Sequence, residues 1–103
     1  DSARAAEMLD RAFGVRPLFP PVLEGRARMR ALNGDLDGAV ADWRRLLALD
    51  TPDRNLFRLE LARALAARGD RTGAKAELLN LLESLPYFWD AQALLLELAE
   101  DGS

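Results

Sequence analysis

The sequence contains few of the side chains that carry out enzyme chemistry. Neither histidine nor cysteine occurs among its 103 residues, so the side chain most used for proton transfer near neutral pH, the commonest metal ligand and any thiolate are absent. Catalysis would have to rest on carboxylates, serines, Tyr87 or Lys75. No nucleophile elbow, phosphate-binding glycine loop or metal-ligand spacing accompanies them. The sequence therefore predicts a protein that is not an enzyme and needs no cofactor or metal.

Two arginines are better candidates for binding than any residue is for catalysis. Arg28 and Arg63 stand 35 residues apart; Glu24 lies four residues before the first, and Glu60 three residues before the second. Glutamate and arginine at this helical spacing attract each other by about 0.2–0.5 kcal/mol per pair. A guanidinium can also hold a ligand carboxylate through two parallel hydrogen bonds. The sequence leaves both possibilities open: a face neutralised by its own glutamates, or a site for an anionic group.

Composition limits the other classes of partner. The chain has 14 basic and 17 acidic residues and a net charge of −3, which repels a phosphate backbone, so nucleic acid is not an expected partner. No run approaches the roughly 18 apolar residues that cross a bilayer, and no signal segment opens the chain. We expect a soluble chain without direct membrane insertion, for which a bacterial-type cytoplasm and a periplasm are both possible. The hydrophobic content of 50% is enough for a continuous core.

An internal repeat organises the chain. Residues 34–41 and 69–76 share five identities in eight positions, at an offset of 35 residues. The same offset aligns Ala39 with Ala74, so the two alanines occupy equivalent positions in the two copies. A partial earlier copy begins near Ala5, 34 residues before Ala39. Duplication of a unit of 34 to 35 residues is the simplest explanation.

Apolar residues at three- and four-residue spacing between turn signals predict helices. Asp35 and Asp70 each follow a glycine, where a carboxylate can cap the next helix and meet the positive end of its dipole. Short loops make sequential helices antiparallel neighbours. The six predicted helices are 2–13, 21–32, 36–49, 54–68, 72–85 and 88–100.

Small residues and one tryptophan are the predicted packing contacts. Helix axes approach to about 8 Å only where small side chains face each other. Trp43 carries a large apolar surface and falls on the apolar stripe of its helix. We therefore assign Trp43 to the core. The small contacts are Ala27, Ala39, Ala62 and Ala74.

A period of 34 residues, with a small-x-x-x-large pattern in one helix and a proline after it, resembles the tetratricopeptide repeat (TPR) family. Residues 61–65 match the first-helix part of the family motif, whereas Leu23 and Arg58 replace its opening tryptophan. The resemblance covers nearly the whole chain. It implies an all-α fold in which six antiparallel helices form a short right-handed α-solenoid. We expect residues 1–103 to be a single repeat domain, excised from a longer protein.

The same resemblance implies that the first helices of the repeats, here 21–32, 54–68 and 88–100, line a concave groove for an extended or helical peptide. Chaperone-binding members of the family clamp a C-terminal carboxylate with lysine and asparagine side chains. This chain has Arg28 and Arg63 where the asparagines of that clamp would be, so a heat-shock-protein tail is not the expected ligand. The expected function is a non-catalytic protein- or peptide-binding scaffold, with the partner unidentified. The expected groove residues are Glu24, Arg28, Leu32, Leu56, Leu59, Arg63, Asp90 and Glu97.

The last predicted helix carries an apolar arc too wide for one neighbour to cover. A further helix of a longer protein, a second copy or a ligand could cover the remainder, and Leu94, Leu95 and Leu98 are the expected self-association residues of a homodimer. The alternative functions are a structural self-association module and a docking arm of a larger enzyme or of a secretion or assembly protein. Residues 87–89, all aromatic, fit a structural hinge, a partner anchor or base stacking.

Overall fold

The computed structural model describes residues 19–101. This part of the chain forms five α-helices and contains no strand. Each helix agrees with a predicted one to within one residue at either end, which confirms the all-α class. The first predicted helix, 2–13, lies outside the described residues. The helices are α2 (Pro20–Leu32), α3 (Leu36–Ala48), α4 (Arg54–Ala67), α5 (Arg71–Ser84) and α6 (Trp89–Asp101).

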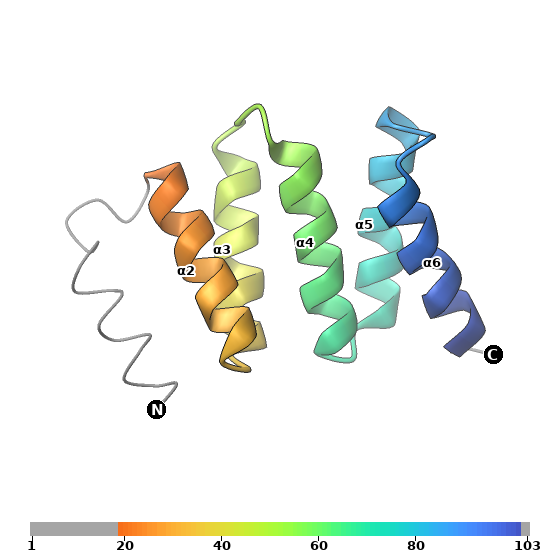
Figure 1. Ribbon diagram of the computed structural model, residues 1–103, viewed down its shortest axis with the longest axis horizontal. Coiled ribbons are helices and arrows are strands. Elements are labelled where there is room, and N and C mark those ends of the chain that lie inside the picture. The colour runs from red at the N-terminus through yellow and green to blue at the C-terminus, as the bar shows by residue number, and fades with distance from the viewer. Residues whose placement is uncertain (1–18, 102–103) are drawn as a thin grey trace.

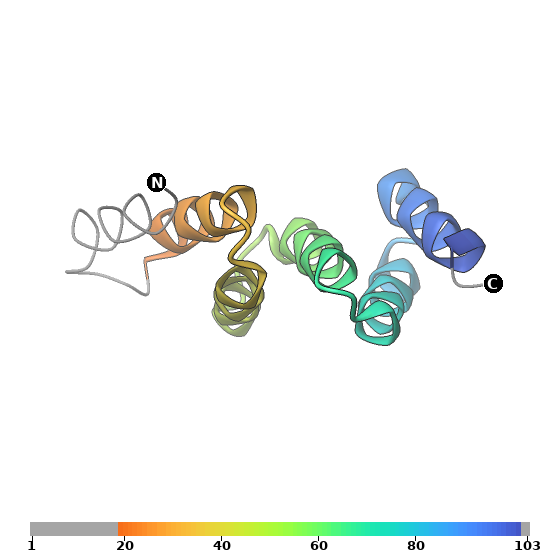
Figure 2. The ribbon, with the colours of Figure 1, turned by 90° about the horizontal axis from the view of Figure 1, so that it is seen from below.

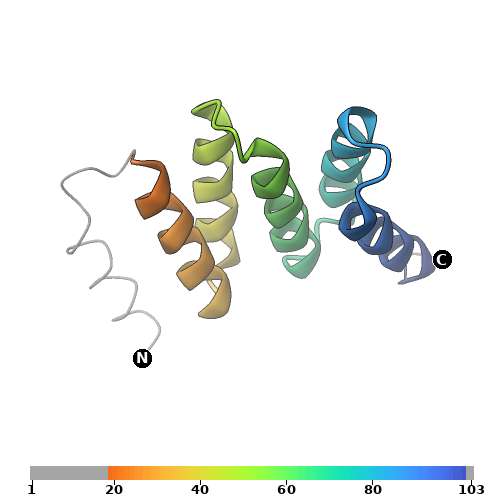
Figure 3. The ribbon, with the colours of Figure 1, turned by 45° about the horizontal axis from the view of Figure 1, so that its top comes forward.

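Consecutive helices pack against one another in a repeat-like order (Figure 1), and α6 also contacts α4. Figure 2 shows that α2, α4 and α6 form one row and that α3 and α5 form the other. The last helix is inclined to α5, as Figure 3 shows. The described residues measure 41 × 29 × 17 Å and are therefore elongated along the row. Each end of the assembly leaves part of a helix surface without a neighbour from the described residues.

The turns that join α2 to α3 and α4 to α5 have the same backbone geometry. Gly34 and Gly69 adopt positive φ angles of 84° and 97°, a region open to glycine at little cost. In both turns the amide of the following aspartate donates to the carbonyl oxygen five residues before it, at 2.8 Å. This hydrogen bond is the one that closes a helix behind a left-handed glycine. The 35-residue sequence repeat is thus also a repeat of local structure.

Both turns continue into the predicted aspartate caps. Asp35 Oδ1 accepts a hydrogen bond from the Gly38 amide at 3.0 Å, and Asp70 Oδ1 accepts one from the Gly73 amide at 2.9 Å. A Cβ atom added at Gly38 or Gly73 would lie 2.3 or 2.5 Å from the other carboxylate oxygen. Glycine therefore recurs at this position because a side chain there would push the cap away.

Removal of a cap should have a measurable cost. We expect Asp70→Ala to lower the free energy of unfolding by about 1 kcal/mol, because the Gly73 amide loses its acceptor. Asp53→Ala is the matched control, since Asp53 occupies the N-cap position of α4 without a side-chain capping hydrogen bond. Urea titrations of the two variants compare them directly. Equal losses in both would show that the Asp70 cap adds nothing of its own.

The predicted packing contacts lie in the core. Ala27, Ala39, Ala62 and Ala74, which are related by the repeat, are all completely buried. Trp43 is 1% exposed and stacks on Phe57, with 5.8 Å between the ring centroids and 30° between the planes. The rings join α3 to α4, so one aromatic pair connects the first pair of helices to the next.

A buried carboxylate fixes α2 against α3. Asp42 is fully buried, and each of its oxygens accepts two hydrogen bonds from arginines. Arg26 donates from Nε at 3.0 Å and from Nη2 at 2.8 Å. Arg30 Nη1 donates at 3.1 Å and Arg45 Nη1 at 2.6 Å. Burial of the single negative charge is thus compensated by charged donors on both helices.

The repeat places an acid at the corresponding position of α5. Glu77 lies 35 residues after Asp42 and accepts a hydrogen bond from Arg58 on α4 at 3.1 Å. In both copies, therefore, the second helix is tied to the helix before it by an acid–arginine pair. The two copies differ in burial: Glu77 and Arg58 are partly exposed, whereas Asp42 is completely enclosed.

Candidate functional site

Four charged side chains form an alternating chain of ion pairs across α2 and α4. Arg28 Nη2 lies 3.2 Å from Glu24 Oε2, and Arg28 Nη1 lies 4.0 Å from Glu60 Oε2. Glu60 Oε1 in turn lies 3.9 Å from Arg63 Nε. The two arginines lie on α2 and α4, which are neighbouring helices of one row (Figure 2). Glu60 is within 4.0 Å of both guanidinium groups. Of the two possibilities left open by the sequence, the internal one is present: each arginine has a carboxylate of its own chain.

A cavity of about 300 Å³ opens beside this chain of charges. Its walls are Arg28, Ala31 and Leu32 of α2, Glu60 of α4, and Trp43 of α3 beneath them. The Arg28 guanidinium carbon lies 5.4 Å from the centre of the Trp43 ring, within range of a cation–π contact. We call this feature the Arg28 cavity. It combines an apolar wall, Leu32 and Ala31, with one charge of each sign.

The structure gathers only part of the predicted groove. Glu24, Arg28, Leu32 and Arg63 lie at or beside the Arg28 cavity, and 83% of Leu32 is exposed. Leu56 is exposed on α4, seven residues before Arg63, and so lies on the same side of that helix.

Leu59 was predicted to line the groove, and this prediction is wrong. It is 2% exposed and belongs to the hydrophobic core. Leu59 is buried because α4 lies in the middle of the array and contacts α3, α5 and α6. A central helix has a wider buried arc than an outer one, and Leu59 falls within it.

The remaining predicted residues lie on α6. Asp90 and Glu97 are exposed there, away from the Arg28 cavity, whose walls come from α2, α3 and α4. Leu98 is buried, and Leu94 and Leu95 pack partly buried against the core. These three leucines cover α4 and α5 because they share the inner side of α6 with Ala91. The prediction that Leu98 forms a self-association surface is therefore wrong.

The aromatic segment 87–89 divides between core and surface. Phe88 packs against the core, which confirms the expectation of a structural ring at this turn. Tyr87 and Trp89, in contrast, are among the most exposed large side chains of the described residues.

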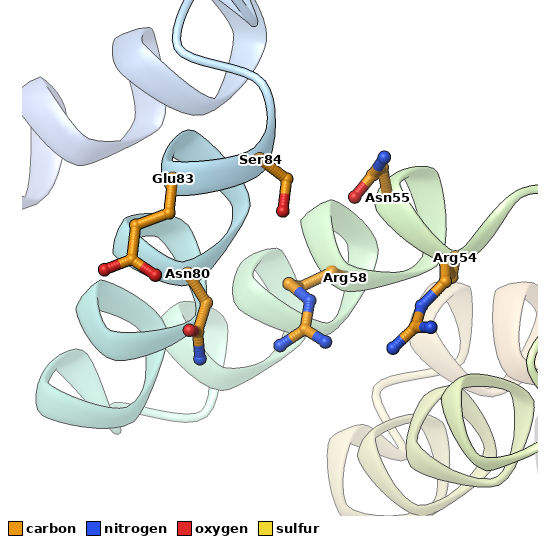
Figure 4. A pocket seen from close by; sticks show the side chains of 6 residues that line it. All are labelled: Arg54, Asn55, Arg58, Asn80, Glu83 and Ser84. Carbon is orange, nitrogen blue, oxygen red and sulfur yellow. The ribbon is translucent and has the colours of Figure 1, made fainter.

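A second cavity, of about 400 Å³, lies between α4 and α5 (Figure 4). All the residues that line it are polar or charged. Arg58 and Asn80 face the space from opposite helices in the close view. The residues that line it are Arg54, Asn55, Arg58, Asn80, Glu83 and Ser84.

The polar cavity is a weaker candidate site than the Arg28 cavity, although it is larger. In both cavities the arginines are paired with carboxylates of the chain: Arg58 with Glu77 at 3.1 Å, Arg54 with Asp50 at 2.8 Å, and Arg28 with Glu24 at 3.2 Å. The difference lies in the apolar surface. The polar cavity offers no apolar wall to anchor a ligand. Arg58 lines the polar cavity and Glu60 lines the Arg28 cavity. The two residues are two positions apart, about 160° around the helix axis, so the two cavities open on different sides of α4.

Two residues of the Arg28 cavity were assigned other roles by the sequence analysis, and Ala31 was missed. Trp43 was placed only in the core, and Glu60 only as a neutralising partner of Arg63. The signal for Ala31 is its position three residues after Arg28, which places both on one side of α2. The floor formed by Trp43 needs contacts between three helices, which spacing along one helix does not reveal.

Comparisons with known proteins do not identify a family for the chain. No protein-family model matches the sequence, and no curated protein matches it significantly. Within residues 19–101, no helix is long and apolar enough to cross a membrane. In the same described part of the chain, no three acidic, histidine or cysteine side chains come together as metal ligands could.

Proposed function

We propose that the chain is a TPR-like α-solenoid that acts as a non-catalytic scaffold and binds a peptide segment of another protein. Support for the repeat comes from the identical turns at Gly34 and Gly69 and from the equivalent burial of Ala39 and Ala74. Support for the binding surface comes from the row formed by α2, α4 and α6 (Figure 2). An array of this kind offers an extended surface to a partner.

The observation that carries the proposal is the Arg28 cavity. Leu32 and Ala31 provide an apolar wall in which a ligand side chain can lose contact with water, and Arg28 and Glu60 provide hydrogen-bonding groups at the rim. Sites that bind ligands commonly join apolar surface to a few polar groups of this kind. Leu32, exposed as it is, would be buried by such a ligand.

The charges around the cavity suit a polypeptide chain as ligand. The Arg28–Glu60 and Glu60–Arg63 distances of 4.0 and 3.9 Å are long for ion pairs. The Arg28–Glu24 pair is shorter, at 3.2 Å, but it is a pair within one helix, and all four side chains are partly exposed. Such pairs contribute about 0–1 kcal/mol each, and a guanidinium has five N–H donors. Arg28 and Arg63 can therefore donate to peptide carbonyls or carboxylates at little cost to the scaffold.

Peptide selection followed by affinity measurement tests the proposal. Peptides selected from a random displayed library against the wild-type domain should contain a recurrent aliphatic residue next to polar or acidic positions. Leu32→Ser and Arg28→Ala should each weaken the selected peptide by about tenfold, because each removes one wall of the cavity. Isothermal titration calorimetry measures the affinities.

Two matched variants serve as controls. Leu79→Ser replaces an exposed leucine of α5, and Arg44→Ala replaces an exposed arginine of α3. Neither residue lines the Arg28 cavity, so both variants should retain wild-type affinity. Equal loss in Leu32→Ser and Leu79→Ser, or no loss in either cavity variant, would count against the cavity as the binding site.

A further inference from the structure

The outer side of α6 carries an apolar stripe that the described residues leave uncovered. Trp89 is 74% exposed and Leu96 61% exposed, and Ala93, also exposed, lies between them. These positions are spaced four and three residues apart, so they share one side of the helix. Single exposed apolar residues are common on protein surfaces, but an exposed tryptophan in line with a leucine marks a contact surface.

The same helix carries charge of only one sign. Its 13 residues include Asp90, Glu97, Glu100 and Asp101, but neither lysine nor arginine. Asp90 and Glu97 are exposed and lie seven residues apart, along one flank of the apolar stripe. The combination is therefore an apolar strip with an acidic border.

The acidic border extends along the helix. Asp90 lies in the first turn of α6 and Glu97 lies near its last turn, which contains no basic residue. A positively charged partner would therefore meet acidic side chains near both ends of α6.

We propose that the outer side of α6 is a second interaction surface, distinct from the Arg28 cavity, and that it binds a basic amphipathic helix of another protein. The partner helix would place leucine-like residues, spaced three and four apart, on Trp89, Ala93 and Leu96. Its lysines or arginines would face Asp90 and Glu97. Recognition of an amphipathic helix depends on apolar anchors at such spacing and on complementary charge.

A second copy of the chain fits this surface less well. A two-fold symmetric contact brings the same patch of both copies together, so Asp90 and Glu97 would face their own equivalents. Like charges opposed at an interface disfavour the wrong partner. The charge pattern thus favours a basic helix over self-association through the same side of α6.

Two synthetic peptides of about 18 residues, long enough for a helix with partner contacts to form, test the proposal. Both carry the same leucine stripe at helical spacing; one has arginines on its flanks and the other has glutamates. Fluorescence anisotropy of the labelled peptides gives the affinities. We expect the basic peptide to bind at least about tenfold more tightly than the acidic one, and the difference to shrink as salt is added.

Variants of α6 locate the binding. Trp89→Ala and Leu96→Ser should each weaken the basic peptide by about tenfold, and Glu97→Gln should weaken it and reduce its dependence on salt. The positions are exposed, so circular dichroism should show an unchanged fold. Leu79→Ser, on the exposed surface of α5, should leave the affinity unchanged.

Three results would overturn the proposal. The first is equal binding of the basic and acidic peptides. The second is equal weakening by Leu96→Ser and Leu79→Ser. The third is a dimeric mass in light scattering that becomes monomeric in Leu96→Ser, since a second copy would then occupy the surface.

Discussion

Asp42→Ala is expected to lower the free energy of unfolding by about 3–5 kcal/mol. The substitution removes the acceptor of four charged hydrogen bonds and leaves Arg26 and Arg30, both largely buried, without the carboxylate between them. Alanine's better helix propensity offsets only about 0.5 kcal/mol of this loss. A domain of this size has a total stability of about 5–15 kcal/mol, so the variant should be partly unfolded at moderate urea concentrations.

Asp37→Ala is the matched control for this prediction. Asp37 also pairs with an arginine, Arg68 at 3.0 Å, but it is exposed. Its removal should cost less than about 1 kcal/mol, as surface pairs and first-turn acids do. Similar unfolding curves for the two variants would show that the buried cluster does not hold α2 on α3.

Trp43→Ala is expected to lower the free energy of unfolding by about 3–5 kcal/mol. The side chain is 1% exposed and connects three helices, through Phe57 on α4 and Arg28 on α2. An indole buries about 150–250 Å², which at about 25 cal/mol per Å² corresponds to about 4–6 kcal/mol of transfer free energy. Thermal and urea unfolding followed by circular dichroism measure the loss.

The chain provides its own control in a second tryptophan. Trp89 is mainly exposed on α6, so Trp89→Ala should change stability by no more than about 0.5 kcal/mol. A loss for Trp89→Ala as large as that for Trp43→Ala would contradict the assignment of Trp43 to the core. The Trp43 ring also lines the Arg28 cavity, so a loss of affinity in Trp43→Ala would not separate binding from folding. This variant therefore tests stability only.

Local signals in the sequence predicted the five described helices and the turns at Gly34 and Gly69 correctly. The glycine–aspartate turns act within a few residues: Gly34 and Gly69 end one helix, and Asp35 and Asp70 cap the next. The boundaries of α2 to α6 therefore follow from short-range chemistry. Because the turns at Gly34 and Gly69 repeat in sequence, the equivalent residues Ala39 and Ala74 were expected to pack alike, and both are completely buried.

The details of burial depend on the position of each helix in the array, and here the sequence was insufficient. Leu59 is buried because α4 has neighbours on three sides, whereas Leu96 is exposed because α6 has them on only one side among the described residues. The same period of apolar residues occurs in both helices. Only the order of the helices in space separates a core leucine from a surface leucine.

Asp42 was overlooked for a related reason. It lies next to the apolar stripe of α3, three residues after Ala39 and four before Leu46, both of which are buried. An aspartate at such a position signals a buried ion pair. The partners are identifiable only after α2 packs on α3, because Arg26 lies 16 residues away in the sequence.

The layout separates two surfaces of different chemistry. The Arg28 cavity lies on the row of α2 and α4 and has charges of both signs, whereas the exposed side of α6 is apolar with an acidic border. The stability predictions test the array, and the affinity predictions test each surface independently.

Chemical-shift mapping by nuclear magnetic resonance tests the proposed scaffold function most directly. A selected peptide is titrated into the isotope-labelled domain, and the perturbed amides are assigned. The account predicts that the largest shifts fall on Arg28, Leu32, Glu60 and the indole N–H of Trp43. Shifts concentrated on the polar cavity around Arg58, or spread evenly over the domain, would contradict it.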